Sequence, residues 1–394
     1  MTGDLERGSA PSDGSPSDVV TSPSSLRLDI TARDGRARLG RLRTAHGDVD
    51  TPAFMPVATQ GTVKGVVPAQ LRDLGAQIVL SNAYHLHLRP GEQLIEELGG
   101  LHRFMGWEGP ILTDSGGYQI FSLEGLRKVS DDGVEFRSHL DGGKLFLTPE
   151  DVVRIQVRLG VDILMPLDEC LPSGADERAC RSALRRTLDW VRRSREVPLA
   201  PGQNLFAIVQ GGLSPELRRE CAAALVPLGF PGYAVGGLSV GEEKRLTLEL
   251  ADLTAELLPR ECPRYLMGVG LPEDLIRFVG MGYDLFDCVL PTRNGRNGMV
   301  FTWTGRMNIR LARYARDPEP IDAECGCYTC RHFSRAYLRH LAAAGEMLAP
   351  QLASLHNLHF YQDLMRRMRT QIASANFASW ASDRLALLES SESA

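Results

Sequence analysis

Several features that define other protein classes are scarce or missing in this sequence of 394 residues. No stretch approaches the roughly 18 consecutive apolar residues of a membrane-spanning helix, and the N-terminus lacks the charged and apolar segments of a secretion signal. Basic residues are not in excess: 44 Lys and Arg against 49 Asp and Glu give a net charge of −5, which argues against binding of nucleic acid over the whole surface. We therefore expect a cytoplasmic protein with no membrane contact.

Positive charge is nevertheless concentrated in one region. Between Arg293 and Arg339, nine arginines stand against four acidic residues. A polyanion could dock there through phosphate contacts. Charge alone fits a solvated arginine-rich surface equally well, so both interpretations stay open at this point.

Cysteine is sparse and unevenly placed. In a chain of this length without a secretion signal, a disulfide framework is not expected. Five of the eight cysteines are far apart in the sequence, and we expect them to be buried small side chains: Cys170, Cys180, Cys221, Cys262 and Cys288. The other three lie in CGCYTC (325–330), a spacing that indicates a metal site.

The thiolates of Cys325, Cys327 and Cys330 need a fourth ligand to complete a tetrahedral zinc site. His356, in LASLHNL, is the best candidate, and the alternatives are His332, His340 and His359. Four protein ligands leave no position for water. We therefore expect one structural Zn²⁺ per chain.

The alternation of apolar runs with helical stretches predicts a (β/α)8 TIM barrel. Eight short apolar runs, from FMPV (54–57) to LFDCVL (285–290), are separated by amphipathic stretches such as 149–160 and 214–229. Buried parallel strands have continuous apolar runs, and eight strand-helix units close a barrel. A doubly wound open sheet is the alternative.

Four further segments are expected around a barrel of residues 54–299. They are a disordered tail rich in Ser, Pro and Gly (1–25), an N-terminal antiparallel lid (26–53), an inserted zinc-binding subdomain (300–352), and a C-terminal helix that completes the barrel and supplies the zinc histidine (353–385).

Polar residues follow the apolar runs, where the parallel strands of a barrel end at one mouth. They are Asn82, Asp114, Asp168, Gln210, Gly236, Gly237 and Asp287. Each acid alone fits a structural cap or an ion pair, but three at one mouth favour catalysis, because poorly solvated carboxylates are costly unless used or paired. Two carboxylates can supply the nucleophile and the proton donor for chemistry at a sugar carbon.

A series of longer motifs occurs in one order along the chain: DSGGYQ (114–119), DEC (168–170), VQGG (209–212), GYAVGGLSVGE (232–242), LMGVG (266–270), FDCVLPTRNGR (286–296), CGCYTC (325–330) and HNL (356–358). With these motifs the chain resembles the tRNA-guanine transglycosylase family, from about residue 27 to 375.

The resemblance implies a role for each matched residue. Asp287 would be the nucleophile that captures ribose C1′, and Asp114 the general acid and base. Base-binding residues would be Asp168, Gln210, Gly236, Gly237 and Leu238, with Tyr118 and Met267 on the two faces of the base. Asn82 and His85 would orient Asp114 or the ribose, and tRNA would contact Arg293, Asn294 and Arg296.

The resemblance also implies the substrates. Bacterial-type members insert 7-aminomethyl-7-deazaguanine at the wobble guanine of GUN-anticodon tRNAs (Asp, Asn, His, Tyr), and also accept guanine. Cys170 and Val240 match this type, since the eukaryotic pattern has a smaller glycine in place of the valine. No additional RNA-binding domain is expected after residue 375, unlike the archaeal type.

A homodimer is a further expectation from the resemblance. Phe333, Tyr337 and His340 follow one another at i, i+4 and i+7, which places an aromatic stripe on one helix face. The same face could instead pack on the barrel, and spacing alone does not decide between the two.

Two other function classes compete. A retaining glycoside hydrolase on a TIM barrel also needs two carboxylates, but it usually lines its sugar subsites with aromatic residues, which make up only 7% of this chain. A non-catalytic tRNA-binding partner subunit would be expected to lack the nucleophile, and Asp287 is present in its motif.

Overall fold

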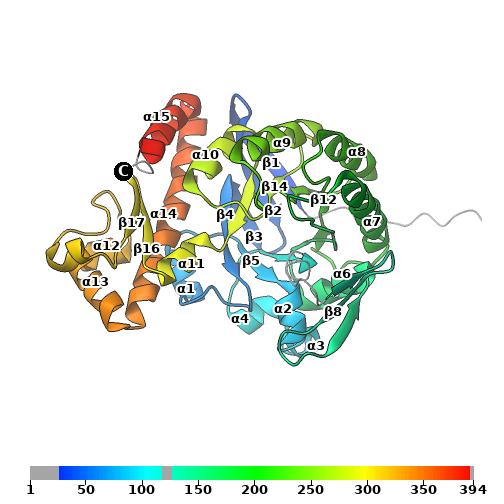
Figure 1. Cartoon of the computed structure of the whole chain (residues 1–394), viewed down its shortest axis with the longest axis horizontal. Helices are drawn as coiled ribbons and strands as arrows, with labels where there is room; N and C mark the ends of the chain where they lie inside the picture. Colours follow the sequence, from blue (N-terminus) through cyan, green and yellow to red (C-terminus); the bar gives the residue numbers. More distant parts are fainter. Residues whose placement is uncertain (1–25, 118–126, 391–394) are drawn as a thin grey trace, which may run out of the picture.

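A sheet of parallel strands forms the centre of the computed structural model, which describes residues 26–117 and 127–390 (Figure 1). Its strands run in the order β11-β10-β6-β5-β4-β15-β14-β13-β12. Their bounds are β4 (Ala53–Ala58), β5 (Val79–Asn82), β6 (Ile111–Asp114), β10 (Ile163–Leu164), β11 (Asn204–Leu205), β12 (Ala207–Val209), β13 (Tyr233–Val235), β14 (Arg264–Leu266) and β15 (Leu285–Cys288). The expected tail (1–25) and Tyr118 lie outside the described residues.

The two edges of this sheet meet at Phe206. Its N–H donates to the carbonyl of Leu164 (3.0 Å), whereas the N–H of the next residue, Ala207, donates to Gly232 (3.1 Å). β11 and β12 are therefore two halves of one apolar run, which pairs with β10 on one side and β13 on the other. The sheet closes as an eight-stranded α/β barrel, and the predicted TIM-barrel fold is confirmed.

Helices follow most strands and cover the outside of the barrel (Figure 1). They are α1 (Pro68–Asp73), α2 (Ala83–Leu88), α3 (Glu92–Glu97), α4 (Gly100–Met105), α6 (Pro149–Leu159), α7 (Glu177–Arg195), α8 (Pro215–Leu225), α9 (Lys244–Leu257), α10 (Pro272–Gly280) and α11 (Leu290–Arg296). Local sequence sets their ends: α6 begins with a Thr148–Asp151 capping box and ends where Gly160 adopts φ 73°.

An antiparallel sheet closes the amino end of the barrel. It consists of β1 (Arg27–Asp34), β2 (Ala37–Thr44) and β3 (Gly47–Thr51). Leu42 and Val49 of this sheet are fully buried among the side chains of the barrel interior. Arg38 forms a buried ion pair with Asp284, the residue directly before β15. The sheet therefore lies opposite the mouth at which the strands end.

A second small antiparallel sheet, β7 (Arg127–Val129), β8 (Val134–Arg137) and β9 (Lys144–Leu147), is inserted between β6 and α6. The sequence pattern did not predict it. Val134 and Phe136 bury their side chains in the core outside the barrel.

The last part of the chain lies at one side of the barrel, and its two final helices pack against the main core (Figure 1). It contains the hairpin β16 (Met299–Thr302) and β17 (Gly305–Asn308), then α12 (Tyr328–His332), α13 (Arg335–Ala344), α14 (Leu348–Ala373) and α15 (Phe377–Ser390). Val300, Ile309, Leu338 and Leu352 belong to a separate small core here. The side chain of Asn357 on α14 binds the backbone of Pro291, Met299 and Phe301, so this helix joins that part of the chain to the barrel.

Among residues 26–117 and 127–390, none of the helices combines the length and apolar character needed to span a membrane.

Candidate active site and metal centre

Two carboxyl groups lie at one mouth of the barrel, on the two strands that flank the β4–β5 pair. Asp114 ends β6, and its Oδ2 accepts a hydrogen bond from Nδ2 of Asn82, its register partner at the end of β5 (2.7 Å). Asp287 lies in β15, in register with Met55 of β4. The charge of Asp287 acts on Asp114, so the fold brings together the two acids that the sequence placed at strand ends.

Asp114 holds its proton unusually well. Burial and the negative charge of Asp287 raise its pKa from 3.8 to about 7, although the hydrogen bond from Asn82 opposes this rise. A carboxyl group with a pKa near neutrality can donate a proton and take it back at physiological pH.

Asp287 has different surroundings. Burial raises its pKa too, but its Oδ1 accepts hydrogen bonds from the Tyr265 hydroxyl (2.6 Å) and the Gly268 N–H (2.8 Å), which both stabilise the ionised form. The same donors hold the carboxylate in one orientation. Two neighbouring acids in unlike environments are the arrangement expected when one acts as an acid and the other as an anion.

A second group of polar atoms lies at the ends of β10, β12 and β13. Gln210 Nε2 donates to Asp168 Oδ2 (2.6 Å), and both residues are almost fully buried. A Cβ atom added at Gly236 or Gly237 would lie 2.5 or 2.4 Å from the Gln210 amide, so a side chain at either position would displace that amide. Burial raises the pKa of Asp168 to about 6, against the hydrogen bond from Gln210.

Two further predicted base-binding residues, Leu238 and Met267, also follow strands of the barrel. Leu238 is buried directly after the two glycines, and Met267, directly after β14, packs against the core inside the barrel.

Neighbouring acids in the DEC motif are separated by the fold. Glu169 forms a two-pronged ion pair with Arg186 of α7 (2.7 and 3.1 Å), whereas Asp168 binds Gln210. Cys170 is mostly buried, and burial raises the pKa of its thiol to about 12. Only Asp168 of the three therefore offers a carboxylate beside the Gln210 amide.

Arg218 of α8 was missed by the sequence analysis. Its side chain is fully buried, and it donates to three backbone carbonyls, those of Gly212 (3.0 Å), Gly236 (3.1 Å) and Gly237 (3.2 Å). The Gly236 carbonyl and the Gly237 N–H belong to one peptide unit, which is planar and trans, so the two groups point in opposite directions. By holding the carbonyl, Arg218 therefore also sets the direction of the N–H. An arginine one turn into a helix normally indicates a solvated face, so no local pattern marks this role.

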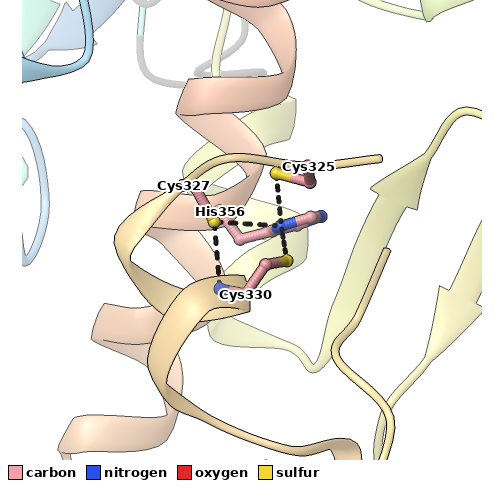
Figure 2. A group of neighbouring side chains, drawn as sticks. All are labelled: Cys325, Cys327, Cys330 and His356. Atoms are coloured by element: carbon pink, nitrogen blue, oxygen red, sulfur yellow. Dashed lines mark hydrogen bonds between the residues drawn. The ribbon is translucent and has the colours of Figure 1, made fainter. Parts of the chain in front are cut away.

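The three cysteines and His356 form one compact cluster (Figure 2). His356 Nδ1 lies 3.6, 3.5 and 3.3 Å from the sulfur atoms of Cys325, Cys327 and Cys330. These separations fit four ligands around a small ion, since ligands about 2.0–2.3 Å from a tetrahedral centre lie about 3.3–3.8 Å apart. The group can therefore hold a metal ion, as the spacing predicted.

The surroundings of the cluster prepare it for metal binding. His356 Nε2 lies 2.7 Å from the Phe301 carbonyl, which places the ring proton there and leaves Nδ1 to face the sulfur atoms. The sulfur of Cys327 accepts a hydrogen bond from the Cys330 N–H (3.3 Å) at the start of α12, which favours the thiolate that a metal needs. His359 approaches only Cys325 (3.5 Å), and His332 and His340 are exposed outside the cluster.

The arginines between residues 293 and 339 differ in exposure and in internal contacts. Arg293 is exposed on α11, while Asn294 and Arg296 are partly buried. Arg335, by contrast, binds Asp317 (3.0 Å) and the Ile321 carbonyl. Some arginines of this region are therefore engaged in contacts within the chain.

The aromatic stripe is accessible in the single chain. The rings of Phe333 and Tyr337 stack with centroids 5.3 Å apart, although Phe333 directly follows α12 and does not lie in α13. Tyr337 is 39% exposed, and α13 instead buries Leu338 and Leu341 against the small core. The stripe therefore does not pack on the barrel.

Most of the chain is similar to known proteins. The family model described as Queuine tRNA-ribosyltransferase matches residues 33–390. The Queuine tRNA-ribosyltransferase of Desulforudis audaxviator is 56% identical over 357 residues, which cover 90% of this chain and 96% of the relative. That of Solidesulfovibrio magneticus is 53% identical over 361 residues, covering 91% and 97%.

Proposed function

The chain belongs to the queuine tRNA-ribosyltransferase family, and we propose that it exchanges the wobble guanine of GUN-anticodon tRNAs (Asp, Asn, His, Tyr) for 7-aminomethyl-7-deazaguanine. The observation that carries the proposal is the pair of Asp114 and Asp287, whose surroundings suit them to unlike roles at one barrel mouth. The reaction needs both a nucleophile and a proton donor.

In the first half of the reaction, an Asp287 oxygen attacks ribose C1′ and the bond from C1′ to guanine N9 breaks. The electron pair of that bond goes to the base, which Asp114 protonates, so that neutral guanine leaves. The enzyme then holds the ribose as a covalent ester of Asp287. The hydrogen bonds from Tyr265 and Gly268 keep the attacking carboxylate oriented beforehand.

The second half reverses these steps with a different base. The incoming base loses its N9 proton to Asp114, its nitrogen attacks C1′, and the Asp287 carboxylate is released. Asp114 returns to its protonated form, which balances the proton over the cycle. A pKa of about 7 suits a group that must give and accept a proton in turn.

The flipped base is read by the Asp168 group. Asp168 would accept from N1–H and the exocyclic amine, while the Gln210 amide and the Gly237 N–H, with Gly236 alongside, would face O6. Met267 would cover one face of the ring and Tyr118, outside the described residues, the other.

Two features favour the aminomethyl base over a bulkier one. The Leu238 carbonyl would accept from the aminomethyl group. Val240, whose N–H is held by Glu242 (2.9 Å), would limit the room beside it.

The exposed side of α11 would bind the tRNA backbone through Arg293, Asn294 and Arg296, because this helix starts directly after the strand of Asp287.

One Zn²⁺ held by Cys325, Cys327, Cys330 and His356 would be structural, since four protein ligands leave no open position. Two copies would pair through the stripe of Phe333, Tyr337 and His340, of which Tyr337 and His340 are exposed in the single chain while Phe333 packs partly against the small core.

An exchange assay tests the proposal. Labelled guanine and unmodified GUN-anticodon tRNA should give labelled RNA with the parent protein, and no label should enter the same tRNA carrying adenine at the wobble position. Asp287→Asn should abolish both exchange and a denaturant-resistant protein-RNA adduct, because an amide is a poor nucleophile. Label in the adenine tRNA, or an adduct with Asp287→Asn, would contradict the assignment.

A further inference from the structure

A second group of metal-binding side chains lies at the amino end of the barrel, remote from the proposed base pocket. His46 comes from the turn between β2 and β3, His102 from α4, and Asp162 from the residue directly before β10. His46 Nδ1 lies 2.8 Å from Asp162 Oδ1, and His102 Nε2 lies 3.2 Å from Asp162 Oδ2. One ligand atom of each residue lies within 4.8 Å of the other two.

From this geometry we propose that His46, His102 and Asp162 form a second binding site for a divalent transition-metal ion such as Zn²⁺, Co²⁺ or Ni²⁺. Two imidazole nitrogens with one carboxylate oxygen are a donor set that these ions accept, whereas Mg²⁺ and Ca²⁺ prefer oxygen alone. The remaining coordination positions would hold water. This site is independent of the proposed exchange reaction.

The contacts between the histidine nitrogens and the Asp162 carboxylate are close to those around a bound ion. Ligands about 2.0–2.1 Å from a tetrahedral ion lie about 3.3–3.4 Å apart. The contacts of 2.8 and 3.2 Å therefore need to open by only a few tenths of an ångström. The His46 side chain is 42% exposed and can swing, and it gives an ion a path from solvent.

The two rings must separate to admit an ion. They stack with centroids 3.7 Å apart and planes 20° apart, whereas two rings bound to one ion would have centroids about 4.5–5 Å apart, a change that a swing of His46 can supply. A neutral imidazole can carry its proton on either nitrogen, so each ring can free the nitrogen that faces Asp162 by moving the proton to the other.

The carboxylate is already oriented by the backbone. Asp162 is fully buried, and its Oδ2 accepts from the Ile111 N–H (2.9 Å) while its Oδ1 accepts from the His46 N–H (3.3 Å). Donors of this kind around a metal-binding carboxylate hold it in place and raise metal affinity. A bound ion would join the β2–β3 turn, α4 and β10, and so tie the N-terminal sheet to the barrel.

Cobalt titration of the full-length protein, with zinc already in the Cys325 cluster, tests the site. We expect one further equivalent with the weak d–d absorption of nitrogen and oxygen ligands and without sulfur-to-cobalt charge transfer. His46→Gln and His102→Gln, which keep an N–H donor for Asp162, should each weaken this equivalent about tenfold or more. Asp48→Asn, an exposed change on the strand that follows the same turn, should not.

Zinc content of the Cys325 cluster should equal one per chain in every variant, which shows that the fold is intact. A second readout is thermal unfolding: Zn²⁺ should raise the midpoint of the parent and of Asp48→Asn, but not of the histidine variants. Uptake of no further ion by the parent, or equal uptake by parent and both histidine variants, would overturn the proposal.

Discussion

Replacing Asn82 with serine should move the pH dependence of the first half-reaction to higher pH. The Asn82 amide donates to Asp114 Oδ2 (2.7 Å) and so favours the ionised form, while its own Oδ1 accepts the His85 N–H (2.9 Å) as the N-cap of α2. Serine keeps the ability to cap the helix but is too short to replace the amide at Asp114. The substitution therefore isolates one hydrogen bond to the acid.

The size of the shift follows from that hydrogen bond. A hydrogen bond to a charged group contributes about 1.5–3 kcal/mol, and one pKa unit corresponds to about 1.4 kcal/mol. Loss of the Asn82 donor should raise the pKa of Asp114 by about 1–2 units above its value of about 7.

Single-turnover adduct formation at a series of pH values measures this shift. The step uses protonated Asp114 to protonate the departing guanine, so its rate falls as pH rises through the pKa of Asp114. A higher pKa keeps the acid protonated to higher pH, and the alkaline limb of the rate profile should move upward by about 1–2 pH units. The maximal rate on the acid side of that limb should change less.

Asn376→Ser, an exposed change far from the mouth, is the matched control and should keep the parent profile. Thermal unfolding of Asn82→Ser should stay close to that of the parent if the helix cap is retained. An alkaline limb that coincides with the parent's, in a folded variant, would refute the role of the Asn82 hydrogen bond and weaken the assignment of Asp114 as the acid.

Four other outcomes are expected. Removal of zinc by a chelator should open the small core around Val300 and Leu338, seen as new proteolytic cleavage between 299 and 347; an unchanged digest would contradict a structural ion. Arg218→Met should raise the KM for guanine about tenfold or more while tRNA affinity stays the same, because three carbonyls lose their donor; equal loss of both would indicate general unfolding. Arg293→Ala should lower the slope of log affinity for tRNA against log salt by about 0.9, and an equal slope would exclude a phosphate contact. Tyr337→Ala should shift sedimentation toward monomer at micromolar concentration, and a parent that is already monomeric would exclude the stripe as an interface.

Much of the architecture follows from the sequence alone. Buried parallel strands need continuous apolar runs, and residues 207–209, 233–235 and 285–288 form strands within the runs expected of them. The metal cluster could also be predicted, because three thiols within six residues are brought together by local chain geometry and need only one more ligand. The polar residues that follow the strands could be predicted to meet at one mouth, because the parallel strands of a closed barrel all end there.

Which of several similar side chains makes a given contact was decided by the tertiary structure alone. His356 and His359 are three residues apart on α14, yet the packing of that helix against Phe301 turns only His356 toward all three sulfur atoms. Glu169 and Asp168 are adjacent, yet Arg186 binds one and Gln210 the other. The buried Arg218, the pairing of Arg335 with Asp317, and the cluster of His46, His102 and Asp162 carry no local pattern either. In each case the partners are distant in sequence and meet only when helices, loops and strands pack, so a pattern read along the chain cannot contain them.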